Sequence, residues 1–280
     1  MAARLFSFFV LWPLILGSLW LFRAHAVVFL VTLLSALTLH EFYGLMARMG
    51  MRPFRKVGLF LGVIMTAAPY YLTEYVFDGD EFAGFTPAVL AVSVVVCGVR
   101  ILGEREPGNR VESLSSTLFG LLYVPFMLHY LTRILLIYAD PNLGVMLCLW
   151  LVATSKFCDC GALAVGLALG KHRLAPEISP KKSWEGAVGG VLTSIGIGAG
   201  IAWLGADYLP DNFTPAVAAL VAVPVAVITI VSDLVESVLK RRADTKDTGA
   251  AIPGIGGAFD LTDSLIFTAP LGYLIFSLLS

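Results

Sequence analysis

The feature that most constrains this chain is a series of long apolar segments, each close to the ~20 residues that a helix needs to cross a bilayer. The segments lack the period-2 alternation of barrel strands, and only helices and closed barrels span membranes. We therefore expect an all-α fold, a polytopic integral membrane protein with about nine transmembrane helices. The expected spans are residues 5–22, 27–47, 57–75, 84–103, 115–139, 144–169, 186–206, 213–232 and 260–279.

The composition agrees with this interpretation. A mean hydropathy of +0.85, with 58% apolar and only 14% charged residues, excludes an ordinary soluble domain. No linker or internal repeat divides the chain. We expect a single membrane domain over residues 1–280, with N-terminal helices over 1–143 and a core over 144–280 that carries the polar motifs.

Charge alternates between successive loops. Most of the 19 Lys and Arg residues follow the second, fourth, sixth and eighth spans, whereas the intervening loops are acidic. By the positive-inside rule, the basic loops are cytoplasmic, the N-terminus is inside and the C-terminus is outside. Arg4, an apolar run and Ala24-His25-Ala26 also resemble a signal peptide, but the run is long for one, and we favour a retained first helix.

The first polar group lies inside the sixth expected span. Asp159 is about ten residues from the inner end of that span, roughly 15 Å at helical rise. An unpaired charge at that depth costs at least ~2.5 kcal/mol, and Lys156, three residues earlier, is placed to pair with it. The pair is either a structural ion pair between helices or the polar floor of a substrate cavity.

The second polar group is the basic loop over residues 170–186. Ser179-Pro180 is typical of a helix start, with an N-cap followed by Pro at the first helical position. Lys181 and Lys182 would then lie on the first turn, where they oppose the helix dipole unless an anion binds there. A loop that only sets topology is the alternative.

The third polar group runs from the end of the eighth span into the ninth. Its spacing puts Asp233, Glu236 and Lys240 on one helix face, and Asp260 and Asp263 on one face of the next helix. Carboxylates converging from two helices beside cations suit Mg²⁺ bound together with substrate phosphates. A solvated charge run is the alternative, but such runs lack the Gly-rich turn found here.

These groups resemble the phosphatidate cytidylyltransferase (CDP-diacylglycerol synthase) family. The signature Ser-x-x-Lys-Arg, Lys-Asp, Pro-Gly-His-Gly-Gly, Asp-Arg-x-Asp is matched in order and spacing by Ser237, Lys240, Arg241, Lys246, Asp247, Pro253, Gly254, Gly256, Gly257, Asp260 and Asp263. The loop over residues 171–186 resembles the family's Ile-Ser-Pro-Lys-Lys-Thr-Trp-Glu-Gly block. The chain departs from the family pattern at Leu163 (for Tyr), Ile255 (for His), Ala258 (for a larger apolar residue) and Leu261 (for Arg).

The resemblance implies a nucleotidyltransferase of phospholipid biosynthesis that transfers CMP from CTP to phosphatidic acid, giving CDP-diacylglycerol and pyrophosphate. It implies catalytic roles for Asp247, Lys246, Lys240 and Arg241. It also implies substrate binding by Asp159, Ser179, Lys181, Lys182, Ser237, Gly256 and Gly257, and Mg²⁺ binding by Asp233, Asp260 and Asp263. The implied partners are CTP, phosphatidic acid and the bilayer, without nucleic acid, and a homodimer is left open. The site would face the cytoplasm at the cell membrane.

Two other functions are compatible with parts of the sequence. A membrane transporter fits the spans and the buried Lys156 and Asp159, but transporters usually show repeats and broken helices at the midplane. A CTP-dependent transferase acting on another lipid is the closer alternative. His40 and Glu41, near the inner end of the second span, are placed where they could reach the site, but we assign neither a role.

Overall fold

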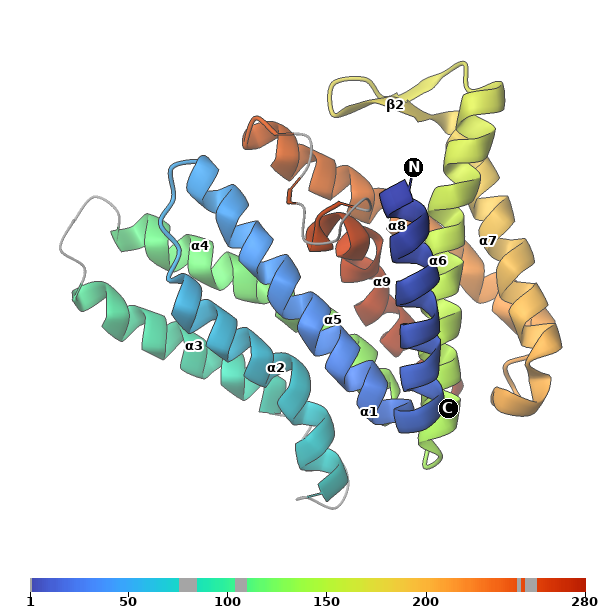
Figure 1. Ribbon diagram of the computed structural model, residues 1–280, viewed down its shortest axis with the longest axis horizontal. Helices are drawn as coiled ribbons and strands as arrows, with labels where there is room; N and C mark the ends of the chain where they lie inside the picture. The colour runs from blue at the N-terminus through green and yellow to red at the C-terminus, as the bar shows by residue number, and fades with distance from the viewer. Residues whose placement is uncertain (1, 76–84, 104–109, 246–247, 250–255) are drawn as a thin grey trace. The chain divides into compact units, whose positions relative to one another are not determined.

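The computed structural model describes residues 2–75, 85–103, 110–245, 248–249 and 256–280, with side chains described from Gly17 onward. Almost all of these residues are helical, as Figure 1 shows. The helices are α1 (Ala2–Arg48), α2 (Arg55–Tyr75), α3 (Phe85–Leu102), α4 (Arg110–Tyr123), α5 (Pro125–Ile134), α6 (Pro141–Leu169), α7 (Trp184–Leu204), α8 (Pro215–Arg242) and α9 (Ala258–Leu279). The other elements are the strands β1 (Arg173–Ala175) and β2 (Ser179–Ser183) and the 3₁₀ turn η3 (Ala206–Tyr208).

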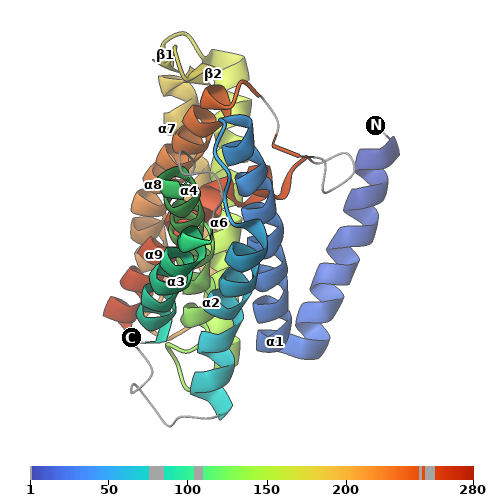
Figure 2. The ribbon, with the colours of Figure 1, turned by 90° about the vertical axis from the view of Figure 1, so that its left-hand side faces the viewer.

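The predicted all-α membrane fold is confirmed. Within the described residues, eight helices are long and apolar enough to cross a membrane, close to the expected number. The difference lies at the N-terminus, where the first two expected spans belong to the single element α1. The backbone of α1 leaves helical geometry at Arg23 (φ 47°, ψ −120°), and Figure 2 shows the chain reversing direction there.

The chain divides into two compact units. The N-terminal unit consists of Met1–Arg133 and Arg242–Thr262, and the C-terminal unit of Ile134–Arg241 and Asp263–Ser280. In the N-terminal unit, Phe42 of α1 packs edge-on against Phe119 of α4 and Phe259 of α9, with ring centroids 5.4 and 5.9 Å apart. This aromatic core joins the start of α9 to the N-terminal helices.

The C-terminal unit is built on close packing between α6 and α7, which lie side by side (Figure 1). Small residues permit this approach, because a Cβ at Gly161 would lie 2.2 Å from the Thr193 hydroxyl oxygen. Trp150, fully buried, donates its indole N–H to the carbonyl of Gly198 (2.9 Å). Small residues therefore serve helix packing at particular positions, such as Gly161 of α6 and Gly198 of α7.

The β1–β2 hairpin corrects one expectation. The predicted helix start at Ser179-Pro180 is wrong: both residues lie in β2, which pairs antiparallel with β1. The helix α7 begins at Trp184, and Ser183 is its N-cap, accepting a hydrogen bond from the Gly186 N–H (3.1 Å). Lys181 and Lys182 are therefore strand residues of the hairpin.

We expect Gly189→Ala to destabilise the protein, because the new Cβ would lie 2.4 Å from the Val165 side chain on α6. Overpacking of this kind typically costs about 1–3 kcal/mol. Gly196→Ala in the same helix is the matched control, since nothing lies within 4 Å of its Cβ position. Thermal unfolding in detergent should show a lowered Tm for Gly189→Ala alone. Equal Tm values for both variants would contradict the packing described here.

Candidate functional site

Three carboxylates converge within the C-terminal unit. Asp233 and Glu236 come from α8 and Asp263 from α9, and one oxygen of each lies within 4.8 Å of the others. Glu236 is buried, with 1% of its surface exposed, and the Asp263 side chain is 13% exposed. The i, i+3 spacing on α8 places its two acids on one face, as predicted from the sequence.

Three lysines pair with these carboxylates, one with each. Lys182 Nζ of β2 lies 2.5 Å from Asp233 Oδ2, and Lys240 Nζ lies 2.7 Å from Glu236 Oε1 one turn earlier on α8. The third lysine, Lys156, lies on α6. Its Nζ is 3.3 Å from Asp263 Oδ1.

Lys156 also connects to a fourth carboxylate. Its Nζ lies 3.7 Å from Asp159 Oδ2, which confirms the pairing expected from their spacing, and it donates a hydrogen bond to Ser264 Oγ (2.6 Å). The group therefore holds one more carboxylate than lysine.

The hairpin presents Lys182 from a fixed base. Glu185, in the first turn of α7, accepts hydrogen bonds from the backbone N–H groups of Lys171 (3.1 Å) and His172. Its carboxylate also lies 2.6 Å from His172 Nδ1. In addition, the Trp184 N–H donates to the His172 carbonyl (2.9 Å). These contacts close the two ends of the hairpin on the start of α7.

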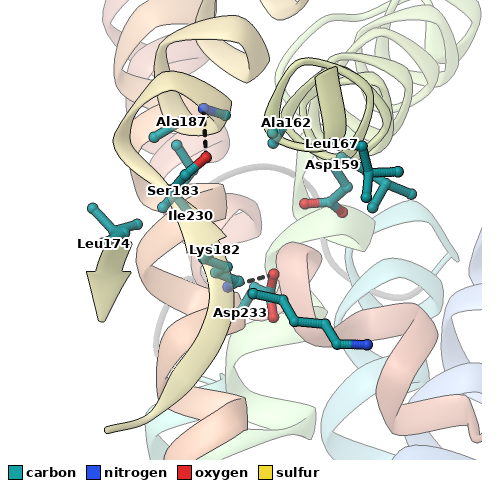
Figure 3. A pocket seen from close by; sticks show the side chains of 13 residues that line it. Asp159, Ala162, Leu167, Leu174, Lys182, Ser183, Ala187, Ile230 and Asp233 are labelled. Carbon is teal, nitrogen blue, oxygen red and sulfur yellow. Dashed lines mark hydrogen bonds and ion pairs between the residues drawn. The ribbon is translucent and has the colours of Figure 1, made fainter. Parts of the chain in front are cut away.

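A cavity of about 220 Å³ is enclosed by four parts of the C-terminal unit: α6, the hairpin, the start of α7 and the C-terminal half of α8. Figure 3 shows Lys182 meeting Asp233 in this cavity, with the Asp159 carboxylate of α6 directed toward the same space. Lys181 lines the cavity as well. The apolar wall of the cavity includes Leu163 and Leu167 of α6, and the Leu167 side chain is 81% exposed. The cavity thus offers cations, carboxylates and an aliphatic surface together.

The structure brings together many of the residues predicted from the sequence. Asp159, Lys182, Asp233, Lys240 and Asp263 belong to the carboxylate and lysine group just described. Three further predicted positions of the C-terminal unit are described: Ser179 begins β2, Ser237 is on α8, and the Arg241 Nε donates to the Ile178 carbonyl of the hairpin (3.4 Å).

The signature segment between α8 and α9 is described in part. Lys246 and Asp247 lie outside the described residues, as do Pro253, Gly254 and Ile255. Gly256 has φ +129°, a conformation that favours glycine. The Gly257 N–H donates to Asp260 Oδ2 (2.9 Å), so this predicted metal ligand acts as a cap within the N-terminal unit.

Sequence reasoning missed three residues as functional candidates. Glu236 was placed on the right helix face but was not named as a ligand, although its spacing from Asp233 carried that signal. Lys156 was seen only as a partner of Asp159. Glu41 contacts the signature segment, accepting a hydrogen bond from the Phe259 N–H (2.9 Å), and no periodic pattern indicated this contact.

Comparisons with known proteins place the chain in a family. The chain matches the cytidylyltransferase family over residues 2–279. It is 36% identical over 177 residues to the phosphatidate cytidylyltransferase of Mycobacterium bovis, a match that covers 63% of this chain and 55% of the relative. It is 30% identical over 287 residues to the protein of that name from Synechocystis, covering 93% and 89%, and 31% identical to that of Haemophilus influenzae, covering 76% and 77%.

The match spans about half the length of the mycobacterial relatives. The similarity to the family itself extends over almost the whole chain, including both the N-terminal helices and the segments that carry the carboxylates and lysines. The chain therefore belongs to the cytidylyltransferase family.

Proposed function

We propose that this protein transfers CMP from CTP to phosphatidic acid, giving CDP-diacylglycerol and pyrophosphate. The observation that carries the proposal is the convergence of Asp233, Glu236 and Asp263 with three lysines beside a cavity that has an aliphatic wall. An anionic nucleotide and an anionic lipid both fit such a site. Family membership and the relatives named phosphatidate cytidylyltransferase support the same reaction.

The reaction needs positioning and charge stabilisation more than a dedicated base. A phosphate monoester is already ionised near neutral pH, so an oxygen of phosphatidic acid can form the new bond to the α-phosphorus of CTP. The bond from that phosphorus to the β-phosphate oxygen breaks, and pyrophosphate leaves. In our proposal Lys181, Lys182, Lys240, Arg241 and Lys246 hold the phosphates, with Ser179, Ser237, Gly256 and Gly257 lining their path.

The carboxylate group fits a divalent cation, for which we propose Mg²⁺. Mg²⁺ prefers a few carboxylates together with phosphate oxygens, and here one oxygen from each of three carboxylates lies within 4.8 Å of the others. Asp233, Glu236 and Asp263 would hold it, with Asp260 and Asp247 as further candidates from the signature. When bound, the ion would stabilise the charge that develops on the leaving pyrophosphate.

The lipid would reach the site from the bilayer. Asp159 lines the cavity beside Leu163 and Leu167, whose side chains are 65% and 81% exposed on a membrane-spanning helix. In our proposal these leucines contact acyl chains while the lipid phosphate meets the lysines. Leu163 stands where the family has Tyr, and we expect this position to affect lipid preference.

Phosphatidic-acid-dependent release of pyrophosphate from CTP tests the function directly. Purified protein in detergent should release pyrophosphate only when CTP, phosphatidic acid and Mg²⁺ are all present, and EDTA should stop the release. Release that requires a different lipid would favour the related transferase. No release with any lipid phosphate would favour the transporter.

We also propose that the site faces the cytoplasm at the cell membrane, from the charge asymmetry of the loops. In a Cys160→Ser background, Glu177→Cys in the hairpin and Asp207→Cys at η3 are both exposed positions. A membrane-impermeant thiol reagent added to intact cells should label the Asp207→Cys protein and leave the Glu177→Cys protein unlabelled. Labelling of both from outside would refute this topology.

A further inference from the structure

Glu41 of α1 contacts the signature segment on both sides of residues 250–255. Its Oε2 atom accepts hydrogen bonds from the Thr248 hydroxyl (3.2 Å) and from the Phe259 N–H (2.9 Å). All three residues belong to the N-terminal unit. One carboxylate oxygen therefore ties together two positions of the chain that are eleven residues apart in sequence.

Glycines let the carboxylate approach the backbone of the segment. A Cβ at Gly249 would lie 2.3 Å from Glu41 Oε1, and a Cβ at Gly257 would lie 2.5 Å from Glu41 Oε2. Neither glycine could carry a side chain without displacing Glu41. The close approach of Glu41 therefore accounts for the absence of a side chain at both positions.

The same face of α1 makes two further contacts, one with the segment and one with α9. Arg48 donates to the Thr245 hydroxyl (3.0 Å), and the Thr38 and Thr262 hydroxyl oxygens lie 2.9 Å apart. Glu41 is the central contact of this face. It also satisfies one of the N–H groups that the first turn of α9 leaves without an intrahelical partner.

We propose that Glu41 is a positioning residue, whose carboxylate holds the two ends of the signature segment in register. The residues it binds are the immediate chain neighbours of two residues assigned to the reaction: Thr248 follows Asp247, and Phe259 precedes Asp260. This inference rests on the proposed function. The placement of Asp247 and Asp260 for catalysis then requires a hydrogen-bond acceptor at position 41 and does not require the negative charge of Glu41.

A series of substitutions at Glu41 distinguishes a hydrogen-bond acceptor from a metal ligand or an acid–base group. Glu41→Gln keeps a carbonyl oxygen at the same reach and should keep kcat within about 3-fold of the unaltered protein. Glu41→Asp is one methylene shorter and Glu41→Ala has no acceptor, so both should lower kcat by about 30-fold or more, with the KM for CTP little changed. His40→Ala, at an exposed neighbour on α1, is the control and should behave as the unaltered protein.

Hydrogen–deuterium exchange over residues 245–262 provides a readout that does not require activity. Relative to the unaltered protein, exchange in this segment should rise in Glu41→Asp and Glu41→Ala and be unchanged in Glu41→Gln. Thr248→Ala, which removes only one of the two bonds, should raise exchange mainly around residue 248, and it covers the case in which Glu41→Ala fails to fold. If the unaltered protein shows no transfer from CTP, the proposed function fails, and exchange still decides the role of Glu41.

An inactive Glu41→Gln protein with an active Glu41→Asp protein would overturn the proposal, because charge would then matter more than reach. Unchanged exchange over residues 245–262 in all three variants and in Thr248→Ala would overturn it as well.

Discussion

Asp263→Asn is expected to reduce metal-dependent transfer by on the order of 10²- to 10³-fold, while the protein remains folded. Asn keeps the shape of the side chain but lacks the charge that a hard cation requires. The local structure should survive, because the Asn oxygen can still accept the Ser264 N–H that now lies 2.6 Å from Asp263 Oδ1. Lys156 would keep its pairing with Asp159 and would not be left as a lone buried cation.

The measurement is the rate of transfer against Mg²⁺ concentration, together with Tm in detergent. Asp207→Asn, at an exposed acid on η3, is the matched control and should leave both quantities unchanged. Near-normal turnover and Mg²⁺ dependence in Asp263→Asn would mean that the ion binds elsewhere.

Asp260→Asn addresses the other acid that the signature assigns to the metal. Its carboxylate accepts the Gly257 N–H, and Asn can do the same, so the cap should be preserved. If Asp260 is a ligand as proposed, its Asn variant should lose activity as Asp263→Asn does. Retained activity would leave Asp260 with the capping role alone.

The second large effect is expected from Lys182→Gln, which should lower kcat/KM for CTP by about 10- to 100-fold. The ammonium group of Lys182 lies in the cavity and neutralises Asp233, so its loss removes a phosphate-binding charge and leaves Asp233 without that partner. Both changes disfavour a bound triphosphate.

Lys171→Gln is the matched control for Lys182, because Lys171 is an exposed lysine at the base of the same hairpin and does not line the cavity. Steady-state kinetics with varied CTP should separate the two variants. Unchanged CTP kinetics in correctly inserted Lys182→Gln protein would reduce the hairpin to a topology-setting loop.

Local periodicity accounts for what could be predicted from the sequence. Apolar length predicted the spans, and helical spacing predicted that Asp233, Glu236 and Lys240 share one face of α8 and that Lys156 pairs with Asp159. These contacts depend on residues within two turns of each other, so the backbone geometry of a single helix determines them.

The hairpin shows where such reasoning fails. Ser-Pro is typical of a helix start, but Pro also fits an edge strand, where its missing N–H is not needed. The two-stranded hairpin uses the second possibility, and α7 takes its N-cap from Ser183, four residues later than expected.

Contacts between distant segments could not be predicted from spacing. Lys182 meets Asp233 across the hairpin and α8, and Glu41 meets Phe259 at a separation of 218 residues. No single segment carries a pattern for either contact. Tertiary packing determines both.

The most direct test of the account uses CTP labelled at one phosphate at a time. With phosphatidic acid and Mg²⁺ present, label in the α-phosphate should appear in the lipid product, whereas label in the γ-phosphate should appear only in pyrophosphate. Both signals should disappear in Asp263→Asn and persist in Asp207→Asn. Label from the γ-phosphate in the lipid, or no lipid label from the α-phosphate, would contradict the transfer of CMP to phosphatidic acid.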